Sequence, residues 1–88
     1  MGHTLTSEEI RRIADVRGFL RSGAARRLRL SLALSEAEVA ASVPCDESAL
    51  SRWETGKRVP RPAAALALAA TYGSLMARSP YGALEGER

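Results

Sequence analysis

The sequence has very little cysteine and no long apolar run. Cys45 is the single cysteine among 88 residues, so no disulfide can form within the chain, which excludes the disulfide frameworks of small secreted domains. No apolar run approaches the roughly 20 residues that cross a bilayer, and the amino terminus has no signal-peptide pattern. We therefore expect a soluble, cytoplasmic protein with no membrane partner.

Aromatic and β-branched residues are also few. Aromatic residues account for 5% of the chain, whereas apolar residues of all kinds account for 45% and are mostly alanine and leucine. Alanine and leucine favour helices over strands, and a chain this short holds one hydrophobic core. The composition therefore predicts a single all-α domain, a compact bundle of five or six helices.

The residues that enzymes and metal sites need are scarce as well. His3 is the only histidine and stands in the amino-terminal lead, where it is better interpreted as a bystander than as a ligand. The sequence has neither a glycine-rich phosphate loop nor paired carboxylates with a pocket. We expect no catalytic residue, no metal and no cofactor, and therefore no enzyme.

The distribution of charge is more informative than the net charge of +3. Residues 21–29 carry four arginines and no acid, and residues 52–61 carry four basic residues against Glu54 alone. Residues 36–47 hold four acidic residues and no base. A mildly basic chain of this kind permits a polyanionic partner without demanding one.

The amino-terminal part predicts an extra amphipathic helix over residues 7–21, after a flexible lead of residues 1–6. Thr6 and Glu9 have the spacing of a capping box. A stripe of apolar residues follows at helical spacing: Ile10, Ile13, Val16 and Leu20. The stripe must be buried on its own domain or on a second subunit, and residues 10–20 are thus also a candidate contact for a protein partner. We favour its own domain because "RSG" is a short connection.

Local signals predict where the remaining helices begin and end. Ser22 can cap the helix that follows it. Pro62 suits the first position of a last helix, and Gly73 predicts its end. Residues 22–76 would then form the main domain, and residues 77–88 a flexible tail.

Two short helices lie close together in the middle of the chain. Ser35 and Glu38 form a second capping-box pattern, which predicts a helix over about 36–42. Pro44 forces a turn, and Asp46 can cap a further helix over about 47–54. Two helices joined by so short a turn have the geometry of a helix-turn-helix, in which the second helix enters the major groove of DNA.

The stretch "LSEAEVAASVPCDESALSRWETGKRVP" resembles the signature of the Cro/repressor-type (XRE) helix-turn-helix family. The resemblance spans residues 22–76 and is specific, because the helix spacings and the Trp-Glu-x-Gly-Lys-x-x-Pro ending agree together. It implies a lambda-repressor-like fold, to which residues 7–21 add a helix. It also implies that Trp53 packs on the core and that Gly56 makes the turn after the second motif helix. The "TGKR" loop would present backbone amides and cations to a phosphate.

The resemblance implies three groups of functional residues. The base-reading residues would be Glu47, Ser48, Ser51 and Arg52. The phosphate-contacting residues would be Ser35, Thr55, Lys57 and Arg58. A structural ion pair would join Arg29 to Glu54.

This sequence departs from the family pattern at two positions. Glu36 stands where the family usually has a phosphate-contacting glutamine, and a carboxylate there would repel the DNA backbone. Pro44 replaces the turn glycine and suggests a different turn. The acidic residues 36–47 therefore predict weak intrinsic affinity unless a dimer or a partner adds to it. Outside the motif, we interpret Arg11, Arg12 and Arg17 as a solvated face.

The resemblance implies a transcriptional regulator that binds double-stranded DNA sequence-specifically in the major groove, with a phage or bacterial repressor as the leading interpretation. Its setting would be the cytoplasm of a bacterial cell or a phage-infected host, and the family implies a homodimer on a palindromic operator. Two alternatives stay open. One is the autoregulating antitoxin of a toxin–antitoxin pair, and the other is a protein-interaction module that keeps the fold and has lost DNA binding.

Overall fold

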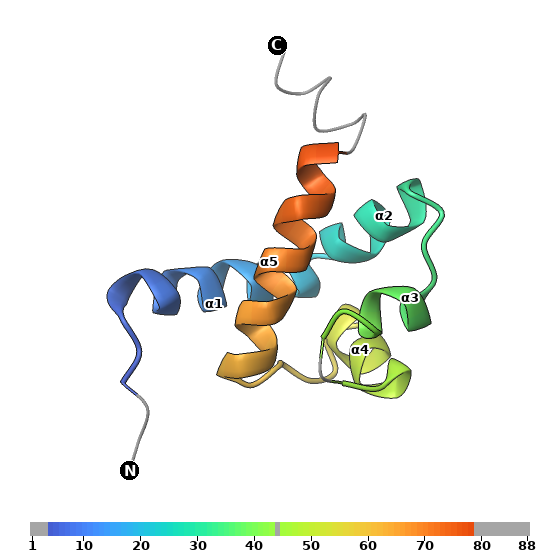
Figure 1. Ribbon diagram of the computed structural model, residues 1–88. Coiled ribbons are helices and arrows are strands. Elements are labelled where there is room, and N and C mark those ends of the chain that lie inside the picture. The colour runs from blue at the N-terminus through green and yellow to red at the C-terminus, as the bar shows by residue number, and fades with distance from the viewer. Residues whose placement is uncertain (1–3, 44, 79–88) are drawn as a thin grey trace.

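The computed structural model describes residues 4–43 and 45–78, and every regular element within them is an α-helix (Figure 1). The predicted all-α fold with five or six helices is confirmed for this part of the chain. Five helices follow one another: α1 (Ser7–Arg21), α2 (Ala24–Ser31), α3 (Glu36–Ala40), α4 (Glu47–Glu54) and α5 (Pro62–Arg78). None of the helices in these ranges has the length and apolarity needed to cross a membrane.

Helix α1 begins with the predicted capping box. The hydroxyl of Thr6 accepts the N–H of Glu9 at 3.0 Å, and the Glu9 carboxylate accepts the N–H of Thr6 at 2.9 Å. Gly23, and not Ser22, holds the N-cap position of α2, but the Ser22 hydroxyl accepts the N–H of Ala24, the first residue of the helix, at 3.2 Å. Gly23 has a φ of 88°, a left-handed conformation that glycine adopts without strain, and it reverses the chain between α1 and α2.

The core lies where α1 crosses α5, and α2, α3 and α4 complete it (Figure 1). Among the described residues, the buried core contains Ile13, Val16, Leu20, Ala25, Val39, Ala40, Val43, Leu50, Ala65, Leu68 and Tyr72. The rings of Phe19 and Tyr72 meet edge to face, with centroids 5.5 Å apart, and so join α1 to α5. Ile10 was predicted to be buried with the rest of its stripe, but it lies one turn beyond this crossing and is 54% exposed.

Helix α5 begins at Pro62 as predicted and does not end at Gly73. It continues to Arg78, so the predicted end of the helix is wrong. Gly73 lies exposed within the helix, while Tyr72 before it is buried and Leu75 after it packs against the core. Burying these two side chains offsets the roughly 1 kcal/mol that a glycine costs inside a helix.

Candidate nucleic-acid interface

Helices α3 and α4 form two consecutive short helices, each with its own cap. Ser35 and Glu38 form the predicted capping box of α3, and the carboxylate of Asp46 accepts the N–H of Ala49 at 2.7 Å at the start of α4. Helix α3 ends at Ala40, two residues earlier than predicted, and residues 41–43 form turns. Pro44, the predicted turn residue, lies outside the described residues.

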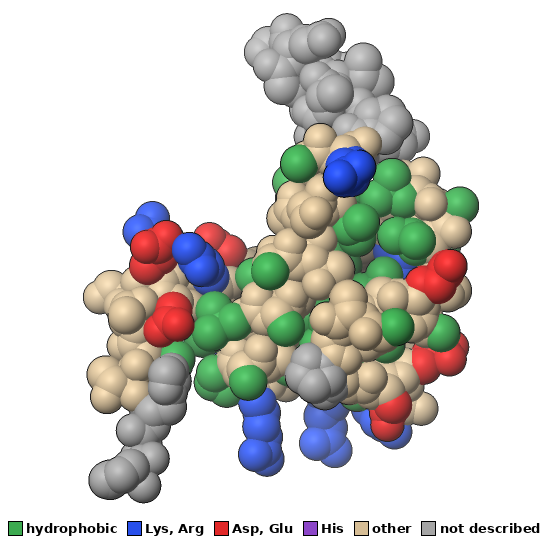
Figure 2. Space-filling model, in the orientation of Figure 1, with side chains coloured by type: hydrophobic (Ala, Val, Ile, Leu, Met, Phe, Trp, Pro, Cys, Tyr) green, Lys and Arg blue, Asp and Glu red, His purple; other side chains and the backbone are tan. Residues whose placement is uncertain are grey.

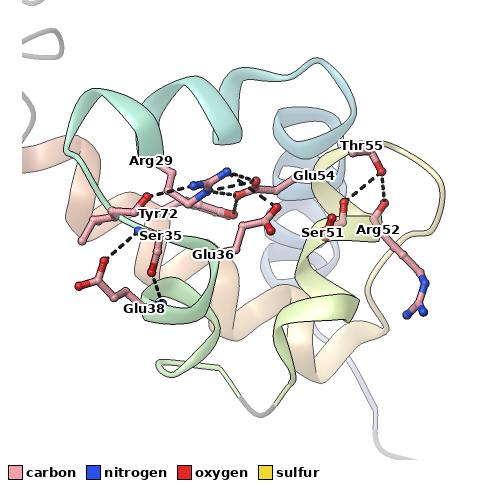
Figure 3. A network of polar contacts seen from close by, with 10 residues as sticks. Arg29, Ser35, Glu36, Glu38, Ser51, Arg52, Glu54, Thr55 and Tyr72 are labelled. Atoms are coloured by element: carbon pink, nitrogen blue, oxygen red, sulfur yellow. Dashed lines mark hydrogen bonds and ion pairs between the residues drawn. The ribbon is translucent and has the colours of Figure 1, made fainter.

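One side of α4 is buried and the other faces solvent. Leu50 and Glu54 are buried, and successive residues of an α-helix are rotated by about 100°, so Ser48 and Arg52 lie on the opposite side, where both are exposed. Glu47 is also exposed, whereas Ser51 is half-buried. The guanidinium of Arg52 extends away from the polar contacts behind the helix (Figure 3). Base reading by these four residues stays a prediction, and three of them have the exposure it requires.

Helix α4 ends in a glycine turn that uses the backbone amides of the loop. Gly56 has a φ of 79°, its N–H donates to the carbonyl of Trp53 at 3.2 Å, and the N–H of Lys57 donates to the carbonyl of Arg52 at 2.9 Å. This pair of bonds is the Schellman pattern. The N–H of Arg58 also donates to the Arg52 carbonyl. The expectation that this loop presents its amides to a phosphate is therefore wrong, and the exposed side chains of Lys57 and Arg58 are left for that role.

Two of the predicted phosphate contacts have hydroxyls that already serve the fold. The Thr55 hydroxyl donates to the carbonyls of Ser51 and Arg52 at 3.0 and 3.2 Å, so donating to a phosphate would require those bonds to break. The Ser35 hydroxyl accepts the N–H of Glu38 at 3.0 Å. Hydrogen bonding to the backbone of Ser35 lowers the pKa of Glu38, and hydrogen bonding to the Ser35 side chain lowers it further. The Glu38 carboxylate therefore stays negatively charged beside Ser35.

Arg29 and Glu54 form a buried ion pair at the centre of a polar network (Figure 3). Their side chains are 7% and 0% exposed, and Arg29 Nη2 lies 2.9 Å from Glu54 Oε1. Arg29 Nε donates to Glu54 Oε2 at 3.0 Å, Arg29 Nη1 donates to the carbonyl of Leu34 at 2.9 Å, and the Tyr72 hydroxyl donates to Glu54 Oε2 at 3.2 Å. Residues of α2, α4 and α5 thus meet behind the exposed side of α4.

Glu36 turns toward this network. Its carboxylate lies 3.8 Å from Arg29 Nη2, and the side chain is only 26% exposed. Hydrogen bonding to Glu54 raises the pKa of Arg29, and the charge of Glu36 adds to that effect. Arg29 therefore offsets part of the negative charge that the sequence placed at a phosphate-facing position.

Arg17 is a residue whose role the sequence interpretation missed. It was expected on a solvated face, but its Nε and Nη2 atoms both donate to the carbonyl of Pro60, at 3.1 and 2.7 Å. One turn further on, Cγ of Arg21 lies 4.0 Å from the place a Cβ at Gly56 would take. Arg17 therefore ties the second half of α1 to the connection between α4 and α5. The partner of Arg17 is 43 residues away, and no local pattern indicates such a contact.

Tyr72 makes the stability of the network dependent on pH. Burial raises the pKa of Tyr72, and the charge of Glu54 raises it further. Because the pKa in the folded state lies above the unfolded value of about 10, the fold favours the neutral phenol, and this stabilisation is lost as the pH rises above about 10. We expect the free energy of unfolding, measured in urea at pH 8 to 11, to fall steeply above pH 10.

The variant Tyr72→Phe is expected to remove most of that fall. It should be less stable than the wild type at pH 8, because Glu54 loses a donor. Burial also raises the pKa of the Cys45 thiol, so Cys45→Ala is the control that shows how much of the alkaline loss comes from the thiol. An alkaline loss of equal size in wild type and Tyr72→Phe would contradict the assignment to Tyr72.

Comparison with known proteins agrees with this geometry. A sequence model of the helix-turn-helix domain family matches residues 22–75, which include α2, α3, α4 and all but the last turn of α5. No curated protein and no solved structure gave a significant match. The match covers more than half of the chain and contains the two consecutive helices α3 and α4. The chain therefore belongs to the helix-turn-helix domain family.

Proposed function

We propose that this protein binds double-stranded DNA sequence-specifically and regulates transcription by placing α4 in the major groove. The observation that carries the proposal is the division of α4 into two sides. The residues on its buried side serve the fold, because Leu50 lies in the core and Glu54 is paired with Arg29. Its other side presents Ser48 and Arg52, which no core contact requires to be polar. An arginine side chain can donate two hydrogen bonds to O6 and N7 of guanine. A serine hydroxyl can donate or accept a hydrogen bond and therefore does not select one base.

Charge around α4 supports a polyanionic partner on one side of the helix. Lys and Arg side chains extend from the lower edge of the molecule, beneath α4 and the beginning of α5 (Figure 2). Lys57 and Arg58, in the connection after α4, are exposed and have no ion-pair partner among the described residues. Such cations hold the register of a protein on DNA without reading its sequence.

A repressor of the Cro type, from a phage or a bacterium, is the finer function that we propose. The segment "SRWETGKRVP" supports it through its likeness to that family's signature. On this proposal two copies bind a palindromic operator whose half-sites lie about one helical turn apart.

A second candidate is a protein-interaction module that keeps the fold and has lost DNA binding. The observation that favours it is the gathering of acidic side chains beside α3 in Figure 2. Glu38 of α3 and Glu47 of α4 are both exposed. Selecting bound sites from random duplex DNA separates the two candidates. Enrichment of one sequence supports the regulator, and no enrichment at low salt supports the interaction module.

Arg52 and Lys57 are expected to contribute differently to binding. Arg52→Ala should cost about 1–3 kcal/mol on the selected site and relax the preference at one base position, because the side chain extends from the exposed side of α4. Lys57→Ala should weaken binding to all sequences equally and lower the salt slope by about 1. Titration of the selected site and of single-base variants measures both effects. Equal weakening of every sequence by Arg52→Ala would refute its role in base reading.

A further inference from the structure

Three arginines surround a hollow beside α4. Arg52 comes from α4, Arg58 from the α4–α5 connection and Arg61 from the residue before α5. Apolar residues also line the hollow, among them Ala49, Trp53 and Ala64. We call this feature the arginine hollow. All three arginines are exposed, and none has an ion-pair partner within residues 4–43 and 45–78.

One carboxylate also lines the arginine hollow. It belongs to Asp46, and one of its oxygens caps α4 by accepting the N–H of Ala49 at 2.7 Å. The formal charge of the lining side chains is therefore three positive against one negative. Three unpaired arginines that line one hollow suit an anion with several oxygens, because each guanidinium can donate two hydrogen bonds.

Prolines and hydrogen bonds restrict the backbone before and after Arg61. Pro60 is buried, and its carbonyl accepts both hydrogen bonds from Arg17. Pro62 follows, so Arg61 is restricted to extended conformations, and its own carbonyl accepts the N–H of Ala65 at 2.8 Å. A side chain that starts from a fixed backbone loses less entropy when it binds a ligand.

The arginine hollow lies next to the exposed side of α4. Ala49 and Trp53, which line it, are one turn apart on α4, and Arg52 lies between that side and the side of Ser48. A helix in the major groove has a phosphate backbone along its flank. The hollow therefore lies where such a backbone would pass if α4 reads bases.

We propose that the arginine hollow binds a backbone phosphate of duplex DNA through Arg58 and Arg61. The inference rests on the proposed function and adds a site and a residue, Arg61, to it. Arg17 is a positioning residue in this site, because it holds Pro60 between the two arginines and does not reach the phosphate itself.

The test measures the affinity for the selected duplex between 0.1 and 1 M salt. One lost phosphate contact lowers the slope of log affinity against log salt by about 0.9, which weakens binding about eightfold at 0.1 M salt. We expect this of Arg61→Ala with base preference unchanged, and we expect Arg61→Lys to recover most of the slope. The matched control is Arg11→Ala, an exposed arginine on the first half of α1, which should leave the slope close to that of the wild type.

The outcomes separate this inference from the proposed function. If the wild type binds DNA and Arg61→Ala behaves like Arg11→Ala, the hollow is not a DNA site and the proposed function stands. If the wild type binds no duplex, both are overturned. A further arm replaces chloride with inorganic phosphate at equal ionic strength. Weakening of the wild type that Arg61→Ala does not share would show that free phosphate competes with the DNA backbone for the hollow, as the proposal expects, and equal weakening of both proteins would count against it.

Discussion

Replacing Glu54 with alanine is expected to lower the free energy of unfolding by about 3–5 kcal/mol. The change leaves the guanidinium of Arg29 buried with the carbonyl of Leu34 and with Glu36 at 3.8 Å, and it removes the acceptor of the Tyr72 hydroxyl. An uncompensated buried charge costs much more than the loss of a surface pair. Chemical denaturation of the two proteins at pH 7 measures the difference.

The chain contains a matched control for this prediction. Arg12 and Glu8 form an ion pair of similar length, 3.1 Å, but their side chains are 59% and 66% exposed. Glu8→Ala should therefore cost no more than about 1 kcal/mol. A double-mutant cycle on Arg29 and Glu54, with Arg29→Met and Glu54→Leu, should show strong coupling, because the double variant no longer buries an unpaired charge. Additive effects at the two positions would disprove the buried pair as a unit.

Features that depend on neighbours in the sequence could be predicted. The capping boxes of Thr6 and Ser35 form as their spacing predicts, and Pro62 begins α5. Each depends on contacts within three or four residues, so the sequence contains the whole interaction. The number of helices and the all-α class follow from the same local patterns.

Features that depend on tertiary contacts could not be predicted in the same way. Gly73 looked like a helix end, but burial of Tyr72 and Leu75 carries α5 through it. Arg17 looked solvated, but folding brings the carbonyl of Pro60 to it. In both cases the deciding partner is far away in the sequence, and only the packed structure supplies it.

The candidate site likewise combines features that the sequence could predict with features that depend on the folded structure. Periodicity was sufficient to place Ser48 and Arg52 on the side of α4 opposite Leu50. It could not show that the Thr55 hydroxyl and the amides of the following loop would be used to end α4. Nor could it show that Arg61 joins Arg52 around one hollow, since the two side chains come from different elements.

Helix α1 is expected to stabilise its own domain, and the substitution Ile13→Asp tests this. Ile13 is 5% exposed in the core that α1 forms with α5. Aspartate there loses the burial of the apolar side chain and places a carboxylate in an apolar site, for a combined cost of about 4 kcal/mol or more. The melting temperature should therefore fall strongly.

The control and the readout decide between one subunit and two. Ile10 belongs to the same stripe but is 54% exposed, so Ile10→Asp should change the melting temperature little if α1 packs only on its own domain. On that view the mass from light scattering and the dependence of DNA affinity on protein concentration stay as in the wild type for both variants. If α1 instead joins two subunits, Ile10 lies in the interface. Ile10→Asp would then lower the mass and flatten the concentration dependence while the domain stays folded, and this result would replace the intramolecular role with a dimer contact.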